Sequence, residues 1–208
     1  MDCPDSVTVV RVAFYGDSIV TGWRGISAPE LRWSSIVASE LGWQELNVAM
    51  DGLGFVRWRG PDKTNAGEPL GVLGDVLASD ADACIVALGC NDAVLVHEMR
   101  DEVETAIARD LDLLLDRFHS NNVIVMDLYS KFADEHPPGW RAVRGLLEEA
   151  VHEQGLSLTP GLSQAIRLDL SLLCDDQVHP NDQGHAALAQ AALPHLRRAL
   201  GNCSCRCP

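Results

Sequence analysis

The chain has 208 residues, and its 30 acidic and 16 basic side chains give a net charge of −14. This length predicts one domain, and the 47% of hydrophobic residues supply enough apolar surface for a full core. Binding to nucleic acid or to an anionic membrane needs clustered cations, so the charge argues against both partners. No apolar run approaches the roughly 20 residues that span a bilayer.

The termini give expectations about compartment and redox state. The start of the sequence is acidic and lacks the basic and apolar regions of a signal peptide, so we expect a cytoplasmic protein. The cysteines are Cys3, Cys84, Cys90, Cys174, Cys203, Cys205 and Cys207. An odd number with four near the termini does not indicate a disulfide framework. The last three have no fourth metal ligand nearby, so residues 201–208 are expected to form a disordered tail.

The hydrophobic pattern predicts alternating strands and helices. Apolar runs rich in β-branched residues predict strands over residues 7–15, 44–49, 83–88, 122–128 and 156–159. Apolar side chains at helical spacing predict helices over residues 30–41, 99–118, 139–153 and 182–200. Pro194 is expected to kink the last helix or to start a second segment. This alternation predicts one α/β domain over residues 1–200, with a polar loop at 59–69.

Small and polar residues follow four of the predicted strands. The segments are Gly16-Asp17-Ser18, Asp51-Gly52-Leu53-Gly54, Gly89-Cys90-Asn91-Asp92 and Asp175-Asp176-Gln177-Val178-His179-Pro180. Binding sites in open α/β sheets form outside the carboxyl ends of the strands, so we expect these segments to meet.

Three of these residues form a candidate catalytic triad. Ser18 lies at a strand-to-helix turn, but a serine hydroxyl is a weak nucleophile without an adjacent base. His179 is the candidate base, and Asp176 precedes it by three residues, close enough to orient the imidazole ring. Asp17 is expected to bond loop N–H groups, since a neighbour of Ser18 points away from it. Asp175 is the rival for orienting His179 and is expected to be solvated.

An acyl-transfer site also needs donors for a developing oxyanion. The candidates are the backbone N–H groups of Ser18 and Gly52 and the side-chain amide of Asn91. Gly54 competes with Gly52 for this role. Asp92 is expected to support the loop rather than to take part in the chemistry.

These segments together resemble the SGNH (GDSL-type) hydrolase family. Gly16-Asp17-Ser18 with Gly22 matches the first block of the family, and Asn47, Ala49 and Gly52 resemble the second. Gly89, Asn91 and Asp92 match the third block, and Asp176, His179 and Pro180 match the last. The resemblance implies a flavodoxin-like three-layer α/β/α sandwich around a five-stranded parallel sheet. It also implies hydrolysis of small-molecule esters or thioesters, without a metal or another cofactor.

Residues that follow the blocks are candidates for substrate binding. Trp23, Phe55 and Arg57 are expected to line the mouth of the cleft, together with Trp58 and Arg59. The alternative is that the aromatic residues belong to the core or rim and that the arginines are solvated. No long insertion offers a lid, which favours short acyl groups. The other histidines lack the motif context of His179. His185 and His195 are expected at the surface, and so is His97, for which the alternative is a place at the cleft.

Two other functions remain open at this stage. An acyltransferase would use the same side chains but pass the acyl group to an alcohol instead of water. A flavodoxin-like module that only binds a ligand would have no need for Ser18, Asp176 and His179 together. The fold alone does not choose between these functions.

Overall fold

A parallel sheet lies at the centre of residues 9–200, which are the part of the chain that the computed structural model describes. Its strands are β1 (Arg11–Gly16), β2 (Gln44–Ala49), β3 (Ala83–Ala87), β4 (Val123–Met126) and β5 (Leu158–Thr159). They lie in the order β2-β1-β3-β4-β5, and every neighbouring pair is parallel. The predicted α/β fold is therefore confirmed, and the expectation for residues 201–208 lies outside the described range.

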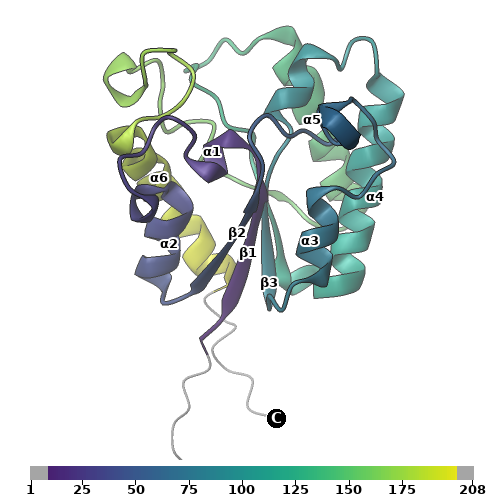
Figure 1. Ribbon diagram of the computed structural model, residues 1–208, viewed down its shortest axis with the longest axis horizontal. Helices are drawn as coiled ribbons and strands as arrows, with labels where there is room; N and C mark the ends of the chain where they lie inside the picture. Colours follow the sequence, from purple (N-terminus) through teal and green to yellow (C-terminus); the bar gives the residue numbers. More distant parts are fainter. Residues whose placement is uncertain (1–8, 201–208) are drawn as a thin grey trace, which may run out of the picture.

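Helices cover both faces of the sheet and make three layers (Figure 1). The helices are α1 (Ser18–Thr21), α2 (Trp33–Leu41), α3 (Val72–Ala78), α4 (Arg100–Phe118), α5 (Pro138–Glu153) and α6 (Asp182–Leu200). On β1, Val12 and Phe14 face the layer of α2 and α6, whereas Ala13 and Tyr15 face the layer of α3, α4 and α5. The central strand is thus buried on both sides, which explains its nearly continuous apolar sequence.

Several elements differ from the sequence predictions, among them three helical segments. The segment predicted to be helical from residue 30 starts with a short 3-10 turn, Pro29–Leu31, and α2 begins at Trp33. Helix α3 was not predicted, because its seven residues include Gly74 and are too short for a clear period. Helix α6 continues through Pro194, which is exposed, so water can bond the carbonyl that loses its intrahelical partner.

No helix within residues 9–200 is long and apolar enough to cross a membrane.

A buried ion pair ties the loop after β2 to helix α4. The Arg59 guanidinium donates to both carboxylate oxygens of Asp110, at 2.6 Å and 2.9 Å, and both side chains are almost fully buried. Arg59 also donates to the backbone carbonyls of Phe55, Pro69 and Leu70. The expectation that Arg59 lines the cleft was therefore wrong, because its charge lies in the core.

His185 is buried, so the expectation that it lies at the surface was wrong. Its Nδ1 accepts a hydrogen bond from the Trp33 backbone N–H at 3.2 Å, where α6 packs against α2. The side chain shares the buried face of α6 with Leu188 and Ala189. His97 is exposed, as expected, and His195 is half-buried.

The buried His185 should make stability depend on pH. Burial lowers its pKa to about 4, whereas a histidine in an unfolded chain titrates near about 6.5. Between these values the unfolded chain binds a proton that the folded chain does not, so acid favours unfolding. The contribution of His185 to the free energy of unfolding should therefore fall as the pH drops from about 6.5 towards 4, whereas the raised pKa of the buried Asp17 acts in the opposite direction.

The substitution His185→Asn isolates this contribution. Asparagine keeps an acceptor near the Trp33 N–H but cannot take up a proton. Chemical denaturation of both proteins at about pH 7.5 and about pH 5 should show that acidification is less favourable to the stability of the wild type than to that of the variant. An equal change in the free energy of unfolding of the two proteins would show that His185 does not titrate in this range.

Candidate active site

The candidate nucleophile lies in the tight turn between β1 and α1. Asp17 caps α1, because its side-chain Oδ1 accepts a hydrogen bond from the Ile19 N–H at 2.9 Å. A Cβ at Gly16 would lie 2.7 Å from the carbonyl oxygen of Ala87, so the turn requires a glycine there. Ser18 is the first residue of the helix and is 8% exposed, at the carboxyl edge of the sheet.

Ser18, His179 and Asp176 form a continuous hydrogen-bonded chain. The Ser18 Oγ is 3.0 Å from His179 Nε2, and His179 Nδ1 is 2.7 Å from Asp176 Oδ2. The other Asp176 oxygen accepts hydrogen bonds from the backbone N–H groups of Val178 and His179. Partial burial opposes ionisation, but these bonds lower the pKa of Asp176 to about 2. The carboxylate is therefore charged at neutral pH, and Asp175 is exposed beside it.

The loop that carries His179 is fixed from two directions. The Cys174 N–H donates to the His179 carbonyl at 2.8 Å, which closes the loop into a narrow hairpin. Tyr129 and Lys131, which follow β4, donate to the carbonyls of Val178 at 2.6 Å and Gln177 at 2.7 Å. The sequence offered no sign of these two residues beyond their position after a strand, since they belong to no motif.

The candidate oxyanion donors lie on the loops after β1, β2 and β3. Among residues 9–200, the N–H groups of Ser18 and Gly52 find no hydrogen-bond acceptor. The Asn91 Nδ2 donates to the Leu53 carbonyl at 2.9 Å and to Asp17 Oδ2 at 3.1 Å. The Gly54 N–H is engaged by the Arg57 carbonyl at 2.9 Å, which leaves Gly52 as the better candidate.

Two buried carboxylates organise these loops. Asp92 is fully buried and accepts hydrogen bonds from the backbone N–H groups of Phe55, Val56 and Arg57, as its expected supporting role requires. Asp17 bonds backbone and amide groups rather than His179, so it is not the acid of the candidate triad. Burial, with the nearby carboxylates of other residues, raises the pKa of Asp17 to about 7.

The three expected substrate residues have different environments. Trp23 is 36% exposed, and its ring lies edge-on to the His179 imidazole, with 4.7 Å between the ring centroids. Phe55 is completely buried in the core beneath α3 and α4, so the expectation that it lines the cleft was wrong. The loop turns it inward because Asp92 holds the backbone at this point. Arg57 is half-buried and donates to Asn91 Oδ1 at 2.7 Å.

An apolar hollow of about 290 Å³ lies between the turn after β3, the segment after β4 and the start of α5, and Val178 of the loop that carries His179 also lines it. Its lining includes Ala93, Val94, Phe132, Trp140 and Val178. Ser130 also reaches it and shares a 2.8 Å hydrogen bond with His136. Within the described residues no carboxylate hydrogen-bonds His136, so this second serine–histidine pair lacks the acid that Ser18 and His179 have.

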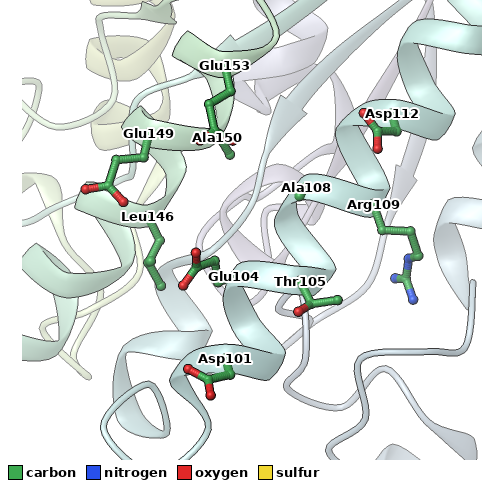
Figure 2. Close-up of a pocket in the computed structure, with 10 residues that line it drawn as sticks. All are labelled: Asp101, Glu104, Thr105, Ala108, Arg109, Asp112, Leu146, Glu149, Ala150 and Glu153. Atoms are coloured by element: carbon green, nitrogen blue, oxygen red, sulfur yellow. The ribbon is translucent and has the colours of Figure 1, made fainter.

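Figure 2 shows another hollow, of about 610 Å³, between α4 and α5. Acidic side chains from both helices surround it: Asp101, Glu104, Asp112, Glu149 and Glu153. No serine or histidine lines this groove, so it offers neither the nucleophile nor the base of an acyl transfer.

The fold and the side chains at its edge together define a class of protein. Hydrogen-bonded Ser18, His179 and Asp176 at the carboxyl edge of a parallel sheet form the arrangement that serine hydrolases share. The model of the GDSL-like lipase/acylhydrolase family matches residues 14–187. The chain belongs to this family and is a carboxylic ester hydrolase, in agreement with the resemblance seen in the sequence.

Solved structures of esterases share this fold. EstA from Pseudoalteromonas sp., inhibited by monoethylphosphonate, has a TM-score of 0.65 and 14% identity over 92% of this chain and 99% of its own. A family two carbohydrate esterase from Cellvibrio japonicus has a TM-score of 0.69 and 16% identity over 92% of this chain and 62% of its own. The acetylxylan esterase Axe2 from Geobacillus stearothermophilus has a TM-score of 0.62 and 19% identity over 97% and 99%, respectively. A search of curated proteins found no match.

Proposed function

We propose that the protein is a serine esterase that hydrolyses short-chain esters with Ser18 as nucleophile, His179 as base and Asp176 as the orienting acid. One observation carries the proposal: the Ser18 Oγ, the His179 ring and the Asp176 carboxylate are linked by contacts of 3.0 Å and 2.7 Å. The N–H groups of Ser18 and Gly52, which have no acceptor within residues 9–200, support an oxyanion site beside this chain of contacts.

The reaction then has two halves. Ser18 Oγ attacks the ester carbonyl while His179 Nε2 takes its proton, and the oxyanion accepts hydrogen bonds from the Ser18 and Gly52 N–H groups. The side-chain amide of Asn91 also donates to the oxyanion, with the N–H that points to Asp17 in the resting site. His179 returns its proton to the leaving alcohol. Water, deprotonated by His179, then attacks the acyl-enzyme, and His179 returns this proton to Ser18 Oγ as the carboxylic acid leaves.

The apolar hollow lined in part by Cys90 and Val178 is the candidate site for a short acyl group. Its volume of about 290 Å³ lies at the lower limit of ligand pockets, which hold about 300–1,000 Å³. Its lining includes Cys90, which precedes Asn91, and Val178, which precedes His179, but none of the three residues of the candidate triad. Acetyl xylan and carbohydrate esterases among the similar structures make small acylated carbohydrates reasonable substrates to test.

The proposal is tested by hydrolysis of p-nitrophenyl esters from acetate to decanoate. We expect wild-type turnover to be greatest for the short esters and the Ser18→Ala variant to keep only a residual rate, lower by a factor on the order of 10⁶. The variant Ala93→Leu should narrow the hollow and reduce kcat/KM for hexanoate by about tenfold, with little change for acetate. Ala108→Leu, in the acidic groove between α4 and α5, is the matched control.

Two results would contradict the proposal. Equal turnover by wild type and Ser18→Ala would remove Ser18 as the nucleophile. A folded wild type that neither hydrolyses any ester nor reacts with a serine-directed phosphonate would favour a binding module. Labelling without hydrolysis would favour an acyltransferase, which product analysis with added alcohols would identify.

A further inference from the structure

The Arg57 guanidinium contacts an uncharged group although acidic side chains dominate the protein. Its Nη1 donates to Asn91 Oδ1 at 2.7 Å and approaches the Gly52 carbonyl at 3.5 Å. Within residues 9–200 the Arg57 side chain forms no ion pair. Arg57 therefore contacts the two residues after β2 and β3 that are candidates for the oxyanion site.

This contact determines which way the Asn91 amide faces. Arginine has only donors, so an asparagine that faces it must present its oxygen. The Asn91 Nδ2 is thereby directed to the opposite side, towards Asp17 and the Leu53 carbonyl. The positive charge of the Arg57 guanidinium beside the amide oxygen also draws electron density from the amide nitrogen. The N–H groups of Asn91 are therefore stronger donors.

The Arg57 side chain is itself held in place by Trp58. The guanidinium carbon lies 4.3 Å from the centre of the Trp58 ring, which Lys63 also approaches at 4.8 Å. The same ring fills the space beside Gly52, where an added Cβ would meet it at 2.3 Å. Rigid packing of this kind restricts the amide to one orientation before substrate arrives.

We propose that Arg57 is a positioning residue that acts through Asn91, orienting and polarising its amide for the oxyanion, rather than a residue that binds substrate. This inference rests on the proposed esterase function. It differs from the expectation that Arg57 contacts substrate at the mouth of the cleft, because Nη1 already donates to Asn91 Oδ1 and approaches the Gly52 carbonyl.

A double-mutant cycle between Arg57 and Asn91 tests the proposal on the best ester substrate. Arg57→Met keeps the aliphatic stem over Trp58 and removes the donors, whereas Lys63→Met removes the other cation at that ring and is the matched control. We expect Arg57→Met to lower kcat by about 10-fold to 100-fold with KM within about twofold of wild type. In the Asn91→Ala background it should change kcat by less than about threefold, because its target is gone.

A second readout does not depend on turnover. The side-chain amide signals of Asn91, assigned by their loss in Asn91→Ala, should shift in the nitrogen–proton NMR spectrum of Arg57→Met and stay in place in Lys63→Met. Unshifted signals in Arg57→Met, a raised KM at constant kcat, or fully multiplicative effects in the cycle would overturn the proposal. Absence of ester turnover in wild type would instead overturn the esterase function, while the NMR result would still decide the contact.

Discussion

Alanine at Ser18, at His179 or at both positions is expected to lower kcat for ester hydrolysis by a similar factor, on the order of 10⁶. The reason is the 3.0 Å contact between the Ser18 Oγ and His179 Nε2, which makes the two groups one functional unit. Without the base the hydroxyl stays a poor nucleophile, and without the hydroxyl the base has no proton to accept. The residual rate then comes from binding and from the oxyanion donors.

Single-turnover and steady-state kinetics of the two single variants and the double variant measure this effect. Asp176→Asn should cost less, about 10⁴ in kcat, because it impairs the orientation of His179 without removing the base. His152→Ala, an exposed histidine on α5, is the control and should match wild type. A double variant much slower than either single variant would mean that Ser18 and His179 contribute independently.

The Asp110→Ala substitution is expected to have the largest effect on stability, about 3–5 kcal/mol in the free energy of unfolding. Asp110 and Arg59 have side chains 0% and 1% exposed, and the guanidinium makes two short bonds to the carboxylate. Removing the carboxylate leaves a positive charge in the core without a counter-charge. The Tyr15 hydroxyl, 3.3 Å from Asp110, would lose its partner as well.

Urea denaturation followed by circular dichroism measures this loss. The surface pair Arg144–Glu148, at 2.9 Å with side chains 43% and 52% exposed, provides the control. Glu148→Ala should change the free energy of unfolding by less than about 1 kcal/mol, because solvent screens an exposed pair. The same small change in the free energy of unfolding for Asp110→Ala and Glu148→Ala would contradict this prediction. It would mean that water solvates the Arg59 guanidinium in the folded protein.

The sequence predicted the elements of the sheet and the residues at its edge because both depend on local patterns. Strand runs of apolar residues and the three-residue spacing of Asp176 and His179 are visible without a structure. Residues that act across long separations were not predictable. Asp110 lies in a regular amphipathic helix, and nothing in the sequence connects it with Arg59, 51 positions earlier.

Burial of individual side chains was harder to predict than their position along the chain. Phe55 follows Gly52 closely, which suggested the cleft, but three backbone bonds to Asp92 turn this loop and direct the ring into the core. His185 was expected at the surface because it lies on the last predicted helix outside any motif, whereas its helix face packs against α2. In both cases the tertiary contact, and not the local sequence, determines the environment.

The hydrogen bonds that Asp92 accepts also determine where the protein could be changed to give the site a new substrate specificity. Strands β2 and β3 are separated by β1 in the sheet, yet Asp92 joins the loops that follow them, so Gly52 and Asn91 are carried by one connected unit. The tip of the first loop, residues 61–65, lies beyond this connection and is exposed throughout. Extra sequence inserted at that tip would leave the connected unit intact. The tip is therefore a suitable place to engineer a cover over the site for larger or more hydrophobic esters.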